Sequence, residues 1–483
     1  MTIKQKTING LIWSFIGNFS NQGVQFIIGL VLARLLAPRE FGIIGMITIF
    51  IALSESFIDS GFNSALIRKK NCSQNDYSTI FFFNLAVSVF FVIVLILSAG
   101  AISRFFDVPI LKPILQVLSL GLIFSSLSLI QQTILIKRID FKLQTKISVI
   151  SALTSGLIGI GMAYSGYGVW SLVARTLSGY IFTTLLLWLW NNWKPTITFN
   201  IQAFKELFGF GSKLLISGLI DTAYNNIYYL IIGKYFSPQE LGFYTRADQF
   251  RKLPSQNITG VVHQVSYPVL ATMTDDPVKL KAAYKKMIRS TIFITSILML
   301  GLAAIAKPMI LTTIGEKWLP TVIYLQMLCF IGMFYPLHAM NLSMLNIQGR
   351  SDLFLRLEII KKTLAVPTII VGIFFGIKIM ILGMFFNTLI AYYLNSYYSG
   401  KMINYSIKEQ IFDISPSILL AVFMGVIVFI IGIIMNAAPI WILTVQLIAG
   451  ASITFIISEL FQLKDYLYIK QIVLEKYTDL KNK

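Results

Sequence analysis

Long apolar runs separated by short polar segments set the hydropathy pattern of the chain. A helix needs about 20 mostly apolar residues to cross roughly 30 Å of hydrocarbon, and fourteen runs approach that length. The pattern therefore predicts an all-α integral membrane protein with about 14 transmembrane helices. The runs lie at about 10–36, 40–62, 78–103, 113–136, 147–164, 167–190, 208–236, 240–270, 287–311, 319–346, 353–376, 379–400, 414–435 and 439–461.

A short polar sequence occurs twice, each time between two apolar runs. LLAPREFG at residues 35–42 returns as YFSPQELG at residues 235–242. The copies share three positions, which are Pro38, Glu40 and Gly42 in the first and Pro238, Glu240 and Gly242 in the second. Proline suits the first helical turn, and a glutamate there faces the positive end of the helix dipole. Each copy therefore predicts a hairpin between two helices, and the repetition indicates an internal duplication.

Six predicted spans separate the two copies, and an even number returns the chain to the same side of the membrane. The duplication therefore predicts two parallel-related six-helix bundles, with the substrate path where they meet. The predicted bundles cover residues 1–200 and 204–402. Two extra transmembrane helices follow within 411–463, and residues 464–483 form a cytoplasmic interfacial tail that mixes apolar residues with lysines.

Composition excludes a soluble globular protein, because only 13% of the residues are charged whereas about a quarter is usual in such proteins. The net charge of +19 is unevenly distributed. With both termini in the cytoplasm, the cytoplasmic segments hold 24 Lys and Arg and the external segments hold 6. Positively charged loops stay in the cytoplasm, so this bias fixes the orientation. Most of the basic excess therefore needs no nucleic acid to explain it.

Ten cations remain inside predicted spans, where ionisable groups are costly and mark functional sites. Arginine in particular matches the fork geometry of phosphate oxygens. Five of the ten are therefore predicted to bind a diphosphate: Arg34, Lys234, Arg246, Arg251 and Lys252. The alternative for Arg251 and Lys252 is neutralisation by Asp248 one helical turn away. For Arg34 and Lys234 it is snorkelling to the outer surface.

Further cations lie near the predicted cytoplasmic ends of their spans, and snorkelling explains them more simply. These are Lys213, Arg356, Lys361 and Lys362. Glu358 stands three and four positions before Lys361 and Lys362, so it is expected to pair with one of them across one turn.

Polar and acidic side chains within the spans form two further candidate groups. Asn18, Asn21, Gln25 and Asn225 either meet sugar hydroxyls or join helices to one another. The acids Asp221, Glu55 and Asp248 either carry a coupling ion or serve as counter-ions to the cations.

Enzymatic signatures are absent from the sequence. No phosphate-cradling glycine loop of the Walker type occurs. His263 and His338 have no neighbouring metal-ligand pattern, and two separated cysteines define neither a disulfide framework nor a metal cluster. We therefore expect no catalytic residues, no metal and no cofactor.

Several longer motifs are similar to those of a known family. After LLAPREFG come FSPQELGFYTRADQFRKLPS (236–255), YPVLATMTDDPVKLKAAYKK (267–286), GEKW (315–318) and NIQGRSDLFLRLEIIKK (346–362). In this order they resemble the polysaccharide transporter branch of the multidrug/oligosaccharidyl-lipid/polysaccharide flippase superfamily. The resemblance covers essentially the whole chain.

That resemblance implies a bacterial inner-membrane flippase, not an enzyme, that works by alternating access. Such proteins carry undecaprenyl diphosphate-linked oligosaccharide units outward for O-antigen, capsule or exopolysaccharide assembly. The implied partners are the lipid-linked oligosaccharide, membrane lipids and polysaccharide polymerases. Cavity arginines bind the diphosphate in the family, and Arg34 and Arg251 are the first positions to match.

Three alternatives stand beside this interpretation. The same superfamily includes lipid II flippases, whose headgroup is also a diphosphate-linked saccharide, and drug or cation antiporters. An antiporter for organic cations is expected to have an acidic cavity, whereas cations outnumber acids within these spans. A membrane scaffold or a polymerase is the third alternative, and a polymerase is expected to carry a long external loop that this sequence does not contain.

Overall fold

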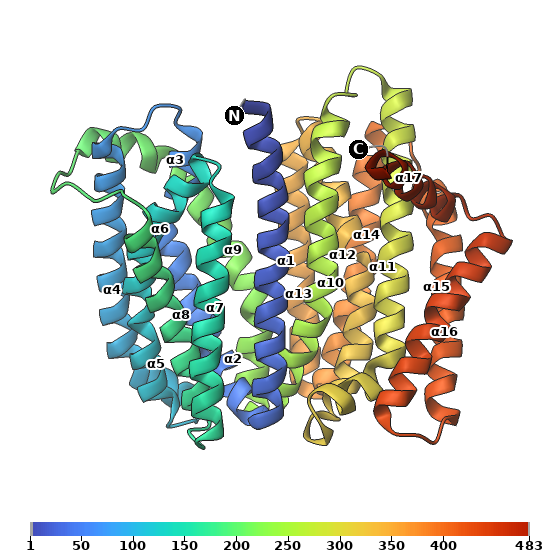
Figure 1. Cartoon of the computed structure of the whole chain (residues 1–483), viewed down its shortest axis with the longest axis horizontal. Helices are drawn as coiled ribbons and strands as arrows, with labels where there is room; N and C mark the ends of the chain where they lie inside the picture. Colours follow the sequence, from blue (N-terminus) through green and yellow to red (C-terminus); the bar gives the residue numbers. More distant parts are fainter. Residues whose placement is uncertain (1–2, 482–483) are drawn as a thin grey trace. The chain divides into compact units, whose positions relative to one another are not determined.

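The computed structural model describes residues 3–481, and every regular element in that range is a helix, which confirms the all-α prediction (Figure 1). Residues 482 and 483 of the predicted tail lie outside the described range. The elements are α1 (Ile3–Leu35), α2 (Pro38–Asp59), α3 (Phe62–Arg68), α4 (Gln74–Phe106), α5 (Leu111–Ser119), α6 (Gly121–Lys137), α7 (Phe141–Tyr164), α8 (Val169–Trp190), α9 (Ile201–Tyr235), α10 (Pro238–Ala271), α11 (Pro277–Thr313), η1 (Glu316–Trp318), α12 (Thr321–Ile347), α13 (Ser351–Phe375), α14 (Ile377–Met402), α15 (Ile407–Ile434), α16 (Pro439–Leu460) and α17 (Lys464–Lys481).

Ten helical segments in the described part of the chain are long and apolar enough to cross a membrane. Two of the ten join short helices end to end, namely α2 with α3 and α5 with α6. The chain is therefore a multi-pass membrane protein. Four other long helices, α1, α9, α10 and α13, do not meet the same criterion of apolarity. The predicted total of fourteen crossings stays a prediction.

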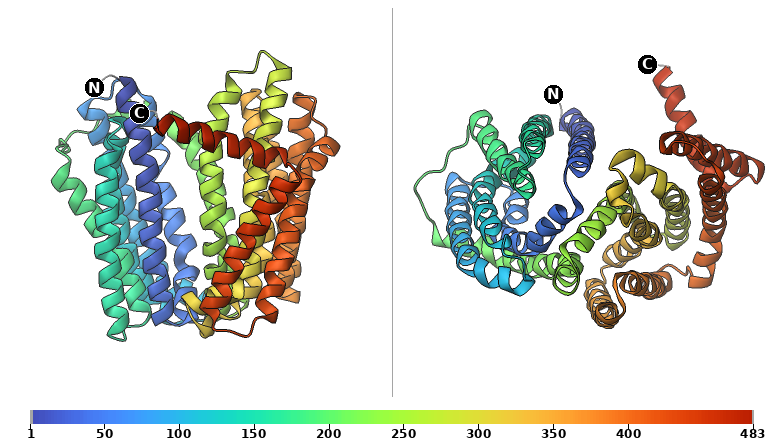
Figure 2. Two further views of the ribbon diagram at one scale, coloured as in Figure 1. Left: turned by 45° about the vertical axis from the view of Figure 1, so that its right-hand side comes forward. Right: turned by 90° about the horizontal axis from the view of Figure 1, so that it is seen from below.

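Two compact units divide the chain, Met1–Gly242 and Phe243–Lys483. The first unit holds α1 to α9 and the first turn of α10. Viewed from below, many of its helices are seen nearly end-on, as in a bundle (Figure 2). The boundary between the two units, after Gly242, thus falls one helix later than the predicted end of the first repeat at residue 200. The repeat boundary itself stays a prediction.

Aromatic packing explains why α9 belongs with the first unit. The ring of the fully buried Phe62 in α3 lies 5.3 Å from that of Phe83 in α4 and 5.9 Å from that of Phe204 in α9. Trp193, between α8 and α9, packs into the same cluster. Burying one large apolar side chain contributes about 1.5–3 kcal/mol. The cluster therefore holds the start of α9 against α3 and α4.

Two glycines let α9 approach α2 closely. Gly61 ends the turn between α2 and α3 with φ at +69°, and a Cβ there would lie 2.5 Å from the carbonyl oxygen of Gly211 in α9. Further along the same contact, the hydroxyls of Ser56 and Thr222 are 3.0 Å apart. Side chains larger than hydrogen would separate the helices at this crossing.

In the second unit, α11 packs against α12, α15 and α16, and α17 runs crosswise to the long helices and contacts α11 and α16 (Figure 2). An ion pair joins α17 to α11, since Arg289 Nε is 2.9 Å from Asp465 Oδ1. The hydroxyl of Ser417 donates to the other carboxylate oxygen at 3.1 Å. Burial raises the pKa of Asp465, and the Arg289 charge acts against that rise. The tail helix is thus anchored through one buried carboxylate.

Replacing Arg289 by glutamine is expected to loosen α17 from the second unit. Removing one partner of a buried pair leaves the other uncompensated and typically costs about 3–5 kcal/mol. Limited proteolysis within 464–481 should therefore be faster in Arg289→Gln than in the parent protein. A matched control is Arg350→Gln, because Arg350 pairs with Asp352 at an exposed site. Equal cleavage rates for Arg289→Gln and the parent would contradict the anchoring role.

Candidate functional site

The more polar long helices carry the predicted site residues with one exception. The residues are Asn18, Asn21, Gln25 and Arg34 on α1, Asp221, Asn225 and Lys234 on α9, and Arg246, Asp248, Arg251 and Lys252 on α10. The exception is Glu55, which lies on α2. Candidates up to residue 242 belong to the first unit and those on α10 to the second.

Both copies of the repeated motif form the hairpins that the sequence predicts. Pro38 starts α2 two residues after α1 ends, and Pro238 starts α10 in the same way after α9. The Glu40 carboxylate accepts a hydrogen bond from the backbone N–H of Ala37, whereas the backbone N–H of Glu240 donates to the Ser237 hydroxyl at 3.1 Å. The two hairpins thus share their backbone design and differ in their capping side chains.

The glycine that recurs at the same place in both copies of the motif has a packing reason. A Cβ on Gly42 would lie 1.6 Å from the carbonyl oxygen of Pro238, and one on Gly242 would lie 1.9 Å from that of Pro38. Both contacts are within the first unit, which extends to Gly242. The two motif copies therefore meet backbone to backbone, and no side chain fits between them.

Arg34 and Lys234 occupy equivalent positions in the motif but have different surroundings. Lys234 donates to the carbonyl oxygen of Phe105 at 2.5 Å, and its ammonium lies 4.8 Å from the centre of that ring. A cation is favourable at this place because the last carbonyls of α4 are the negative end of its dipole. Arg34 is exposed. Of the two, Arg34 is the more accessible to an anion.

The structure brings together Asp248, Arg251 and Lys252, which we call the α10 triad. The Asp248 carboxylate is 2.5 Å from an Arg251 nitrogen and 2.7 Å from the Lys252 ammonium. Its side chain is only 4% exposed, against 12% for Arg251 and 32% for Lys252. Asp248 thus pairs with both cations, as the alternative to diphosphate binding expects. One negative charge against two positive charges leaves a net charge of +1 within the helix bundle.

Arg246 lies two residues before Asp248 and has its own contacts. It is buried, and it donates to the side-chain oxygen of Gln249 at 2.7 Å. Its guanidinium also lies 5.6 Å from the centre of the Trp318 ring in η1. Such a cation–π contact contributes about 0.5–2 kcal/mol. Arg246 therefore joins α10 to η1, whether or not it also meets a ligand.

Two partners on α8 escaped the sequence analysis as site residues. The Tyr180 hydroxyl donates to Glu55 at 2.7 Å, and the Arg175 guanidinium donates to the side-chain oxygen of Gln25 at 3.1 Å. These pairs join residues 125 and 150 positions apart in the sequence. No local pattern in α8 indicates them. Arg175 lies inside the predicted span at 167–190 and is the tenth of the intramembrane cations, and this position was the one available signal.

The other polar candidates of the first unit lie along α1 and α9. Asn18 is exposed, and the side-chain oxygen of Asn21 is buried without a hydrogen-bond partner. Asp221 and Asn225 are both exposed on α9. A polar ligand can therefore reach the side chains of Asn18, Asp221 and Asn225 but not the buried oxygen of Asn21.

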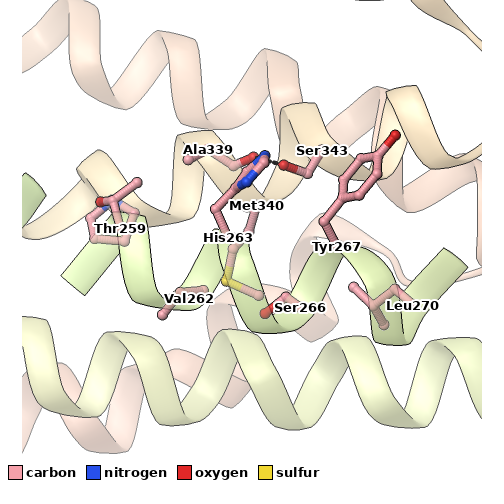
Figure 3. A pocket seen from close by; sticks show the side chains of 10 residues that line it. Thr259, Val262, His263, Ser266, Tyr267, Leu270, Ala339, Met340 and Ser343 are labelled. Atoms are coloured by element: carbon pink, nitrogen blue, oxygen red, sulfur yellow. Dashed lines mark hydrogen bonds between the residues drawn. The ribbon is translucent and has the colours of Figure 1, made fainter. Parts of the chain in front are cut away.

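A small pocket lies between α10 and α12 in the second unit (Figure 3). The rings of His263 and Tyr267 stack there with centres 5.5 Å apart, and the Ser343 hydroxyl donates to the Ala339 carbonyl at 2.8 Å. None of the described lining residues is Lys, Arg, Asp or Glu. Among the described residues, no three His, Cys, Asp or Glu side chains are grouped as metal ligands. The α10 triad, not this pocket, has the chemistry to hold an anion.

The sequence is similar to those of known proteins. Residues 31–323 match the model of a family described as "Polysaccharide biosynthesis protein". The chain is 24% identical to the lipopolysaccharide biosynthesis protein WzxC of Escherichia coli (strain K12), over 77% of this chain and 76% of that protein. It is 23% identical to the teichuronic acid biosynthesis protein TuaB of Bacillus subtilis (strain 168), over 73% of both.

The fold is similar to that of solved structures. A lipid II flippase, MurJ, in an inward closed conformation superimposes with a TM-score of 0.76 at 16% identity, over 93% of this chain and 98% of that one. At this identity the likeness establishes a common fold and leaves the ligand to the chemistry of the site.

Proposed function

Since the chain belongs to the polysaccharide biosynthesis protein family, whose model covers more than half of it, we propose that it is a flippase for lipid-linked oligosaccharides. Its substrate is an oligosaccharide repeat unit on undecaprenyl diphosphate, which it moves from the cytoplasmic to the external leaflet by alternating access. It performs no covalent step and so is not an enzyme. It resides in the bacterial cytoplasmic (inner) membrane with both termini in the cytoplasm, as the 24 to 6 distribution of Lys and Arg indicates.

The observation that carries this proposal is the α10 triad. Its net charge of +1 lies more than one helical turn inside a helix of 34 residues, where an ionisable group is costly unless it has a function. A diphosphate is an anion whose oxygens accept charge-assisted hydrogen bonds from Arg and Lys. The triad therefore suits the headgroup that all substrates of this kind share.

The roles of the other site residues follow from their chemistry. Arg34 adds positive charge in the first unit and Arg246 in the second, and Lys234 adds its charge when it leaves the Phe105 carbonyl. Asn18, Asn21, Gln25 and Asn225 supply amides that hydrogen-bond to sugar hydroxyls. The polyprenyl chain stays in the bilayer, and the released saccharide passes to a polysaccharide polymerase.

A depletion experiment tests the function. Cells that lose this protein are expected to accumulate undecaprenyl diphosphate-linked oligosaccharide in the cytoplasmic leaflet and to lose surface polymer, and a plasmid copy should restore both. Accumulation of lipid II instead would assign the protein to peptidoglycan precursors. Unchanged glycan lipids together with altered drug resistance would favour an antiporter and overturn the proposal.

Ion coupling is assigned to the acids Glu55, Asp221 and Asp248, with Glu55 as the first to test. Its carboxylate accepts a hydrogen bond from the uncharged Tyr180 hydroxyl at 2.7 Å. One charge moved across 100 mV is worth about 2.3 kcal/mol, which corresponds to roughly 50-fold accumulation.

Glu55→Gln is therefore expected to lose the part of transport that depends on an ion gradient, by up to about 50-fold at 100 mV. Reconstituted vesicles with and without the gradient measure it. Tyr180→Phe keeps the carboxylate and serves as the matched control. Full gradient-driven transport by Glu55→Gln would rule Glu55 out as the carrier.

A further inference from the structure

The linker that joins α8 to α9 exposes three large apolar side chains in close succession. Ile197, Phe199 and Ile201 are 97%, 52% and 64% exposed. Ile197 stands at the centre of a three-residue turn, because the backbone N–H of Thr198 donates to the carbonyl oxygen of Thr196 at 2.7 Å. Adjoining apolar groups that stay exposed mark a surface that contacts another molecule or a membrane.

Hydrogen bonds fix this orientation, since the polar residues between the apolar ones bind the start of α4. Three of these bonds run from the Thr196 N–H to the Ser78 hydroxyl at 3.0 Å, from the Thr198 hydroxyl to the side-chain oxygen of Asn75 at 3.1 Å, and from the Asn200 N–H to the Thr79 hydroxyl at 2.9 Å. In Figure 2 the linker passes around the outside of the first unit. The polar side of the segment is therefore held against α4, and the apolar side chains are left on the outer surface.

Trp190 marks the level of the membrane surface beside this segment. It is the last residue of α8, which is long and apolar enough to cross a membrane. It is 36% exposed, and the Lys146 ammonium lies 4.2 Å from the centre of its ring. Tryptophan is enriched at the boundary between hydrocarbon and headgroups, and lysine extends its ammonium toward that boundary. The exposed segment starts seven residues after Trp190 and therefore lies near this boundary.

Charge favours an anionic surface as the partner of this segment. Lys194 and Lys205 flank the three apolar residues and are both exposed. The nearest acid along the chain, Glu206, is 2.9 Å from the Lys69 ammonium and so already has a cation. With both termini in the cytoplasm, as proposed above, the segment lies on the cytoplasmic side, where anionic lipids attract Lys and Arg.

We propose that residues 194–205, which we call the linker anchor, bind the surface of the cytoplasmic leaflet. The three exposed apolar side chains insert at the boundary between headgroups and acyl chains, and Lys194 and Lys205 bind the phosphates of anionic phospholipids. The linker anchor is already ordered by its bonds to α4, so binding loses little conformational entropy. This role does not depend on the substrate that the protein carries.

Depth-dependent fluorescence quenching tests the linker anchor. Full-length protein with Ile197→Cys is labelled with bimane and placed in nanodiscs of phosphatidylcholine and phosphatidylglycerol, in which some lipids carry a nitroxide near the headgroup. Fluorescence lifetimes separate inserted from free label, and the label at position 197 is expected to be mostly inserted. Because Ile197 is almost fully exposed, the substitution disturbs no packing. The parent protein, labelled in the same way, gives the background from Cys72 and Cys329.

The matched control is Val278→Cys, because Val278 is also apolar and 79% exposed but follows two acids, Asp275 and Asp276. Its label is expected to stay in water. Lys194→Gln with Lys205→Gln is expected to lower the inserted-to-free ratio at position 197 by about 25-fold, since each lysine near an anionic surface contributes about fivefold. Nanodiscs of phosphatidylcholine alone should lower the ratio to a similar extent.

Three results would overturn the proposal. One is equal insertion of the labels at positions 197 and 278. Another is an inserted-to-free ratio that responds neither to phosphatidylglycerol nor to the two lysine substitutions, which would remove anionic lipid as the partner. The third is a label at position 197 that iodide reaches in the nanodiscs but not in native membranes, which would assign this surface to a protein partner.

Discussion

Export of lipid-linked glycan is expected to fall by at least about 100-fold when Arg251 and Lys252 are both replaced by alanine, because each charge-assisted contact to a phosphate contributes about 1.5–3 kcal/mol. Both cations belong to the same triad, so no neighbouring member replaces them. The measurement is surface polymer per cell at matched expression, together with the leaflet distribution of the glycan lipid. Lys279→Ala, which removes an exposed cation of the same unit, should export normally.

This double variant also leaves Asp248 as a buried carboxylate without its two cations, which threatens folding as well as binding. Adding Asp248→Asn removes that charge and isolates the loss of the anion site. The triple variant is expected to regain the parental melting temperature and to remain inactive. Wild-type export in the double or the triple variant would remove the α10 triad from the mechanism.

Local chemistry made the hairpins predictable from the sequence. Proline fixes φ near −65° and has no N–H, so Pro38 and Pro238 mark the starts of α2 and α10 whatever packs around them. The spacing from Asp248 to Arg251 and Lys252 is equally local, since positions three and four apart share a helical face. These features depend on a few residues that are adjacent in the chain.

Other parts of the fold depend on contacts between distant residues. The predicted span at 113–136 is broken at Leu120 between α5 and α6, and the predicted second span ends at Asp59 before the left-handed Ser60 and Gly61. The sequence Asp-Ser-Gly at 59–61 was a turn signal that hydropathy alone overlooked. The Leu120 break has no such signal.

The candidate site shows the same division. Hydropathy and charge identified which helices are polar but not which side chains meet. The pairs Tyr180 with Glu55 and Lys234 with the Phe105 carbonyl bring together residues more than a hundred positions apart. The predicted pairing of Glu358 with Lys361 or Lys362 is confirmed, whereas the partial burial of both lysines depends on the neighbours of α13 and could not be predicted from spacing.

Alanine at Gly42 is expected to destabilise the protein by about 3 kcal/mol or more, at the upper end of the usual cost of overpacking. The new Cβ would lie 1.6 Å from the Pro238 carbonyl oxygen, and backbone atoms cannot move aside as a side-chain rotamer can. Thermal unfolding in detergent measures the loss. Gly100→Ala is the matched control, because a Cβ at this glycine in α4 meets nothing within 4 Å. Alanine there is expected to be neutral or slightly stabilising, since it favours the helix.

The reciprocal contact gives this prediction a second and sharper form. Gly242→Ala should cost as much as Gly42→Ala, because its Cβ would lie 1.9 Å from the Pro38 carbonyl oxygen. Both clashes are relieved by the same movement, a separation of the two motif backbones. The double variant should therefore cost little more than either single one, with a coupling energy of roughly −3 kcal/mol in a double-mutant cycle. Additive costs would mean that the two glycines sit in independent contacts, and the duplicated motif would then not meet as a pair.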